Sequence, residues 1–145
     1  MKIVKAEVAD VSKVLPLFHA YRQFYRHDVD ARAESFLKDR LTNKESIILF
    51  AEDKEGIQGF MQIYPTFSSR RLGPIWTLND LYVKPDARRK KVASQLMDEC
   101  MKMARENSIL AVGLSTQISN INAQECYKKY GFKKDNDFFY FNYSI

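Results

Sequence analysis

The stretch T-L-N-D-L-Y-V-K-P-D-A-R-R-K-K-V-A-S-Q-L-M-D-E-C, residues 77–100, decides the fold because it predicts a strand, a basic turn and a helix in direct succession. Apolar, β-branched and aromatic residues run up to Val83. Pro85 ends the strand, since proline has no N–H for a sheet and biases the preceding residue away from helix. Beyond the turn, an apolar stripe at helical spacing predicts an amphipathic helix, with Val92, Leu96, Cys100 and Met103 as its members.

Four consecutive cations, Arg88 to Lys91, lie in the turn before this helix. A helix N-terminus offers unpaired N–H groups and a partial positive charge, so added cations favour a bound anion. Taken alone, such a run is typical of a solvated basic turn. Its position between an apolar strand and an amphipathic helix favours a phosphate site instead.

The segment L-Y-V-K-P-D-A-R-R-K-K-V-A, residues 81–93, resembles the acyl-CoA motif of the GNAT N-acetyltransferase superfamily. In that motif a strand is followed by Arg/Gln-x-x-Gly-x-Gly/Ala. Arg88 and Ala93 match the outer positions, and Lys91 stands where the family usually has glycine. A second segment, N-I-N-A-Q-E-C-Y-K-K-Y-G-F at 120–132, is similar to the family's Asn-x-x-Ala-x-x-x-Tyr-x-x-x-Gly-Phe pattern. The order and separation of the two segments also fit the family.

The whole chain predicts one α+β domain over residues 1–145, with about seven strands and four helices. Early strands are joined by hairpins and later strands alternate with helices, which is typical of a mixed sheet with helices on both faces. The resemblance implies a mostly antiparallel seven-stranded sheet, splayed between strands four and five, with acyl-CoA in the splay. The expected strands are 2–8, 46–52, 57–64, 76–83, 109–116, 132–134 and 138–143, and the expected helices are 10–25, 30–41, the one that follows the basic turn, and 122–130.

Composition narrows the class of protein and its partners. Hydrophobic residues make up 46% of the chain and charged residues 28%, the balance of an ordinary soluble domain. No apolar run reaches the roughly 20 residues of a membrane-spanning helix, and no signal peptide is recognisable, so a cytoplasmic chain with reduced cysteines is expected. No His/Cys cluster has metal-site spacing, so no metal is expected. The net charge of +5 favours anionic partners, either nucleic acid or a phosphorylated cofactor.

The resemblance implies that acetyl-CoA is the cosubstrate and that its phosphates bind the basic turn. Backbone N–H groups would cradle the pyrophosphate, and arginine side chains would add charge-assisted hydrogen bonds. In the family, amides of the preceding strand bind the pantetheine arm and the thioester carbonyl. Asn120 and Asn122 either bind the pantetheine arm or cap the helix beside them. The expected cofactor-binding residues are Leu81, Tyr82, Val83, Arg88, Arg89, Lys90, Lys91, Val92, Ala93, Ser94, Asn120 and Asn122.

Acetyl transfer to an amine requires a base for the amine and an acid for the leaving thiolate. An alkylamine has a pKa of about 10.4 and is mostly protonated at neutral pH. Asp80 interrupts an apolar strand, where an unpartnered carboxylate is costly, and an acidic residue of this strand often serves as the base in the family. Asp80 is therefore either the general base or a structural carboxylate bonded to backbone or an arginine. Tyr127 matches the family's general acid, and the alternative is an aromatic core residue.

The segments 21–25, 67–69 and 75–83 resemble a subgroup of small family members that includes polyamine, histone and D-amino-acid acetyltransferases. This similarity implies a primary amine as acceptor, either a polyamine, an amino acid or a lysine side chain. Subgroup members often pair through their C-terminal strands, and F-F-Y-F-N-Y-S-I at 138–145 is aromatic on both faces, so a homodimer is expected. The expected aromatic walls of the acceptor pocket are Tyr25, Tyr64, Phe67 and Trp76.

Three functions compete at this point. The first is an N-acetyltransferase that moves acetyl from acetyl-CoA to an amine within a ternary complex. The second is a nucleic-acid-binding module, but the basic residues are spread among 18 acidic ones, and no nucleic-acid-binding motif is recognisable. The third is a lapsed family member that binds acyl-CoA or a protein without turnover. Lys91 keeps this third function open, because a non-glycine residue costs about 1–2 kcal/mol if that position demands a positive φ. The first is preferred, with neither nucleic acid nor membrane as a partner.

Overall fold

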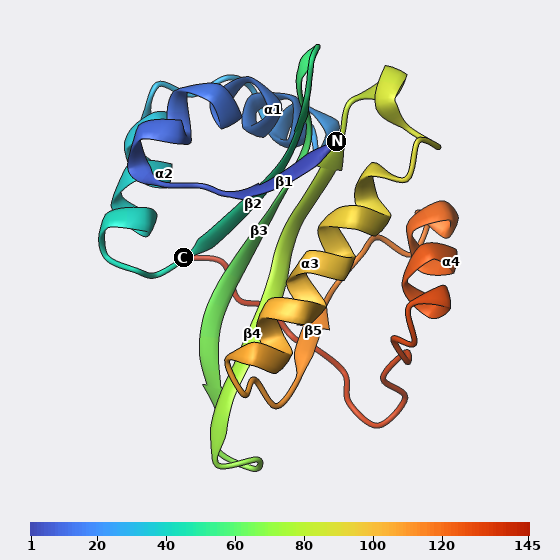
Figure 1. Ribbon diagram of the computed structural model, residues 1–145. Coiled ribbons are helices and arrows are strands. Elements are labelled where there is room, and N and C mark those ends of the chain that lie inside the picture. Colours follow the sequence, from blue (N-terminus) through green and yellow to red (C-terminus); the bar gives the residue numbers. More distant parts are fainter. The chain divides into compact units, whose positions relative to one another are not determined.

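The computed structural model describes residues 1–145, which form two compact units, Met1–Leu114 and Ser115–Ile145. The first unit contains a five-stranded sheet and three α-helices, and the second contains one α-helix (Figure 1). None of these helices is both long enough and apolar enough to cross a membrane. The strands are β1 (Lys2–Lys5), β2 (Ile47–Asp53), β3 (Gly56–Ser68), β4 (Gly73–Val83) and β5 (Val112–Leu114), and the helices are α1 (Val11–Phe24), α2 (Arg32–Thr42), α3 (Val92–Glu106) and α4 (Ile121–Lys129).

The sheet has the order β1-β2-β3-β4-β5, with the first four strands antiparallel and β5 parallel to β4. The pairing of β4 with β5 covers only three residue pairs, from Trp76 with Val112 to Leu78 with Leu114. Beyond Leu78, β4 continues to Val83 without a partner from β5. The last part of β4 therefore has an open edge on that side.

The helices of the first unit cover both faces of the sheet, α1 and α2 on one and α3 on the other (Figure 1). Ile48 and Phe50 pack into the core beneath α1 and α2. Leu49 and Ala51, which are also fully buried, point to the α3 face because successive side chains of a strand alternate. The near-continuous apolar run of β2 is thus explained by burial on both sides.

Five strands are present where the sequence predicted seven, because residues 132–134 and 138–143 are not strands. Between these two segments, Asp135 Oδ1 accepts hydrogen bonds from the N–H groups of Asp137 and Phe138, so the chain bends locally without strand pairing. Residues 132–134 and 138–143 do not pair with each other, for a physical reason. A two-stranded hairpin is marginal by itself, and an aromatic run without polar alternation specifies no register.

The loop expected at 65–74 is mostly strand, because β3 extends to Ser68 and β4 begins at Gly73. Phe67 pairs with Pro74 and Pro65 with Trp76, so the two prolines lie inside a long hairpin. The strand expected at 109–116 shortens to the three residues of β5.

In the second unit, α4 has defined caps at both ends. Asn120 Oδ1 accepts a hydrogen bond from the N–H of Ala123 at 3.2 Å, so Asn120 caps the helix N-terminus. Gly131 has a φ of +91°, and the N–H of Phe132 reaches back to the carbonyl of Tyr127 at 3.1 Å. This left-handed glycine follows the last residues of the helix and ends it.

Candidate functional site

A β-bulge in β4 organises the first part of the site. Gln62 of β3 pairs with Asp80, and the next residue, Ile63, pairs with Leu78, so Asn79 is an extra residue without a partner. A bulge reverses the side-chain alternation of its strand. Asp80 therefore faces α1 and α2 together with Gln62, whereas Leu78 faces α3.

Asp80 is a buried carboxylate, 2% exposed, held by side-chain amides. Gln62 Nε2 donates to its Oδ2 at 2.5 Å, and Asn79 Nδ2 donates to its Oδ1 at 2.8 Å. Burial raises the pKa of Asp80, and hydrogen bonds from Gln62, Tyr21 and Asn79 partly oppose this rise. The structural alternative from the sequence, a carboxylate bonded to backbone or an arginine, is not what is observed. A buried acid of this kind is typical of a site that binds a cation or accepts a proton.

Asp80 opens into a cavity of about 390 Å³ between α1, the start of α2 and the sheet. Tyr25 and Tyr64 line this cavity, so two of the four expected aromatic walls lie beside Asp80. Tyr21, which was not among the four named walls, also lines the cavity, and its ring stands edge-on to that of Tyr25 with 5.1 Å between the ring centroids. The signal was the helical spacing of aromatics from Phe18 onward. The full lining is Phe18, Tyr21, Arg22, Tyr25, His27, Phe36, Tyr64, Asn79 and Asp80.

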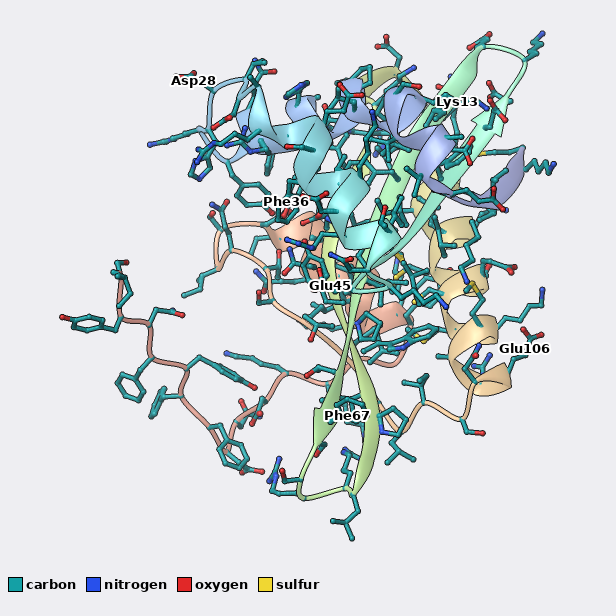
Figure 2. All side chains as sticks on the ribbon, turned by 90° about the vertical axis from the view of Figure 1, so that its left-hand side faces the viewer. Lys13, Asp28, Phe36, Glu45, Phe67 and Glu106 are labelled. Carbon is teal, nitrogen blue, oxygen red and sulfur yellow. The ribbon has the colours of Figure 1, made fainter.

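Trp76 and Phe67, the other two expected walls, do not line the cavity. Trp76 is 4% exposed and lies before the bulge, on the face opposite Asp80. An uninterrupted strand would have kept the two residues on one face, because they are an even number of positions apart. Phe67 is 81% exposed near the tip of the β3–β4 hairpin, far along the sheet from Phe36 (Figure 2).

The hydroxyls of Tyr21 and Tyr64 stay protonated at neutral pH. Burial raises the pKa of Tyr64 to about 12, and the negative charge of Asp80 adds to the rise. Burial and Asp80 likewise raise the pKa of Tyr21, whose hydroxyl also lies 3.4 Å from the carbonyl of Asn79. Both hydroxyls can therefore donate hydrogen bonds to a ligand or to Asp80.

A second cavity, of about 290 Å³, lies where α3 begins. Arg89 and Lys91 both have a φ of +63°, and no side chain caps the helix. A left-handed residue directly before a helix turns neighbouring N–H groups into an anion-binding concavity. Arg88 Nε donates to the carbonyl of Val83 at 3.3 Å, which ties this turn to the end of β4. The lining residues are Val83, Ala87, Arg88, Arg89, Lys91, Val92, Ala93 and Ser94.

The residues of this second cavity fit a phosphorylated cofactor. Two arginines and a lysine line the cavity at the start of a helix, and these are the residue types that bind phosphate. Lys90, expected in the same set, is exposed and does not line the cavity. Leu81 and Tyr82 are half-buried on the stretch of β4 that has no β5 partner.

The two cavities lie along one strand. Asp80 lines the first and Val83 the second, three residues apart, or roughly 10 Å along an extended chain. The open edge of β4 runs between them. One strand thus carries an anion cradle, free main-chain groups and a buried carboxylate in succession.

The remaining predicted residues belong to the second unit. Tyr127 is half-buried on α4, with its ring edge-on to that of Phe132 at 5.9 Å. Asn120 caps α4, which is one of its two expected roles, and Asn122 is exposed in the first turn of the helix.

Comparison with known proteins defines the class: the chain belongs to the GNAT family of acetyltransferases, whose family model matches residues 14–132. Among its relatives is a Bacillus subtilis protein named uncharacterized N-acetyltransferase YhfO, 40% identical over 142 residues, covering 97% of this chain and 95% of the relative. A probable acetyltransferase of Haemophilus influenzae is 30% identical over 129 residues, covering 86% and 88%. A crystal structure of a probable acetyltransferase superposes with a TM-score of 0.93 at 38% identity, covering 100% and 98%. The protein is therefore an N-acetyltransferase of the GNAT family.

Proposed function

We propose that the protein transfers an acetyl group from acetyl-CoA directly to a primary amine bound beside Asp80. The observation that carries this proposal is the order of features on β4. A buried carboxylate without an ion-pair partner lies three residues from an anion cradle, and each of the two has its own cavity. An amine acceptor and a phosphorylated donor would then meet along one strand.

The cradle at the start of α3 would hold the phosphates through Arg88, Arg89 and Lys91 and through main-chain N–H groups of the turn. The open edge of β4 between Leu81 and Val83 offers main-chain groups to the amides of the pantetheine arm. When bound, acetyl-CoA supplies a thioester, whose acetyl carbon forms a bond to the acceptor nitrogen as its bond to sulfur breaks.

Asp80 is the proposed general base. The acceptor enters as an ammonium ion, which the buried carboxylate attracts, and one proton passes from its nitrogen to Asp80. The second proton that the nitrogen loses on forming the amide balances the one that the leaving thiolate takes up. A raised pKa suits this role, because a base closer to neutral pH holds the proton more readily than an ordinary carboxylate. The neutral hydroxyls of Tyr21 and Tyr64 add hydrogen bonds without competing for the proton.

We propose that Tyr127 donates a proton to the leaving thiolate, because Tyr127 matches the general acid of the family motif. Tyr127→Phe should lower kcat roughly a hundredfold and leave the Kd for acetyl-CoA unchanged. Tyr130→Phe, at the C-cap of α4, is the matched control and should keep kcat. Equal activity of the two variants would remove Tyr127 from the reaction.

Titration calorimetry with acetyl-CoA and with CoA tests the cofactor half of the proposal. Binding at micromolar levels is expected in spite of the strained Lys91. A panel of primary amines, read by release of the CoA thiol, then tests transfer. Binding without turnover of any amine would favour the lapsed family member, and no binding up to millimolar acetyl-CoA would reject the cradle.

We also propose a homodimer formed through residues 138–145. The support is a run of exposed aromatics, since Phe139 and Phe141 are 90% and 92% exposed. Sedimentation velocity at tens of micromolar should give a dimer for the native chain and a monomer for the Phe139→Ser, Phe141→Ser variant. A monomeric native chain would reject this assembly.

A further inference from the structure

We infer that the acceptor is an amino carboxylate, such as an amino acid, whose amine binds at Asp80 and whose carboxylate binds at Arg22. The inference rests on the proposed function and names the chemical class of its acceptor. It comes from the polar groups that line the 390 Å³ cavity, which belong to one aspartate, one arginine and one histidine.

Arg22 has the properties of an anion-binding residue that has no anion. Its Nη1 donates to the main-chain carbonyl of Asp28 at 2.8 Å, which fixes the guanidinium at the α1–α2 connection without neutralising it. The nearby carboxylate of Asp30 is already taken, because Arg32 binds it through Nη2 at 2.7 Å and through Nε at 3.0 Å. Arg22 forms no ion pair of its own, although its charge also acts on Asp30 at longer range, and it is the one arginine that lines the cavity.

The opposite charge lies at the inner end of the cavity. Asp80 is 2% exposed, whereas Arg22 is half-buried, and both line the same space. A molecule with an ammonium group and a carboxylate would satisfy both, and a guanidinium binds a carboxylate through paired hydrogen bonds. His27 lies in the lining as a second group able to contact the anion.

A polyamine fits this arrangement poorly. It would bring two or more positive charges to a cavity with a single carboxylate and would place one of them near a fixed guanidinium. The aromatic walls formed by Phe18, Phe36 and the tyrosines instead favour an apolar or aromatic part between the two charges.

The test compares amino acids with the amines that lack only the carboxylate. Phenylalanine is paired with phenethylamine, and lysine with 1,5-diaminopentane. Each pair is measured by calorimetric binding to the protein and by acetyl-CoA-dependent thiol release. For the better pair, the amino acid should bind roughly tenfold or more tightly than the amine, as expected for a charge-assisted hydrogen bond.

Arg22→Gln separates charge from loop positioning, because glutamine still offers an N–H to the Asp28 carbonyl. This variant should lose the preference for the carboxylate and keep the affinity for the plain amine. Arg26→Gln, an exposed neighbour outside the cavity lining, should keep the preference.

Two results would overturn the inference: plain amines that bind as tightly as their amino acids, or an Arg22→Gln variant that weakens both members of a pair equally. The binding measurement decides the matter even if no amine is acetylated. Absence of turnover with a retained preference for the carboxylate would reject the proposed transfer and leave the acceptor class standing.

Discussion

Gln62 and Asp80 lie directly opposite each other in β3 and β4, and Gln62 Nε2 donates a hydrogen bond of 2.5 Å to Asp80 Oδ2. Both residues are buried, and the bulge at Asn79 turns Asp80 toward this partner. The other amide atom of Gln62, its Oε1, is buried without a hydrogen-bond partner. Neither residue suits an apolar strand pair, so the pair is retained at a cost to stability, as is common at functional sites.

Asp80→Asn should therefore be at least as stable as the native chain at neutral pH. Burial raises the folded-state pKa of Asp80, so the folded chain holds the proton more firmly than the unfolded chain does. The native chain then loses stability as the pH rises from about 3.9 through the raised folded value. The variant lacks this fall. Urea unfolding of both chains at pH 4 to 8 measures this fall in stability. An Asp80→Asn variant that is less stable than the native chain at pH 8 would contradict the prediction.

The same variant should lose acetyl transfer. Without Asp80 the cavity has no carboxylate to take the proton of the amine, so kcat should fall roughly a hundredfold or more. The Kd for acetyl-CoA should not change, because the cradle lies on another part of β4. Asp39→Asn, an exposed acid on α2 outside the cavity, is the matched control. Near-native turnover of Asp80→Asn would show that Asp80 is not the base.

Gln62→Met should move the pH dependence of the reaction. The hydrogen bond from Gln62 lowers the pKa of Asp80, so its removal lets burial raise that pKa further. The acid limb of the log(kcat/KM) profile should then shift to higher pH. If Gln62 has only a structural role, kcat/KM should be lower at every pH and the acid limb should not shift. That result would show that Gln62 does not tune the pKa of Asp80.

The local parts of the site could be predicted from the sequence, and the parts that depend on pairing could not. Pro85 and the apolar stripe of α3 are short-range signals, and they placed the basic turn at the helix start. The bulge at Asn79 depends on the pairing register of β3 with β4, and no single residue type predicts that register. That single extra residue is why Trp76 lies on the face opposite Asp80 and does not line the cavity.

Arg22 and Gln62 show the same limit. A polar residue within G-F-M-Q-I-Y, residues 59–64, was a signal for Gln62, but its partner became visible only with the strand register. Arg22 sits among aromatics at 21–25, where a sequence offers no way to tell a solvated cation from one that lines a cavity. The missing C-terminal strands reflect a run whose aromatics lack the alternation that would fix a register.

Two substitutions of Lys91 should separate the effect of its backbone strain on stability from the effect of its charge on acetyl-CoA binding. Its φ of +63° is the left-handed conformation that the family's glycine adopts easily. Lys91→Ala removes the ammonium and keeps the Cβ, so it should weaken acetyl-CoA binding without a gain in stability. Lys91→Gly also relieves the backbone strain. Its free energy of unfolding should therefore exceed that of Lys91→Ala by about 1 kcal/mol.

Calorimetry and urea unfolding on both Lys91 variants give the two effects. If Lys91→Ala binds acetyl-CoA as tightly as the native chain, the ammonium does not contact the cofactor. If the two variants have equal stability, the backbone at Lys91 is not strained in solution.

Gly59 should be required for the cradle because it lets α3 approach the sheet. A Cβ at this position would lie 2.9 Å from the Tyr82 carbonyl oxygen and 2.9 Å from Val92 Cγ1. The carbonyl is main chain and cannot yield cheaply, so Val92 and the start of α3 must shift. Gly59→Ala should therefore cost about 1–3 kcal/mol of stability and weaken acetyl-CoA binding.

The amine cavity lies on the opposite face of the sheet and should be less affected, so the Kd for the acceptor should change little. Gly113→Ala in β5 is the matched control, since a Cβ there meets no atom within 4 Å. Urea unfolding and calorimetry with acetyl-CoA compare the two variants. Equal stability and equal affinity for acetyl-CoA would show that the packing of α3 on Gly59 does not hold the cradle in place.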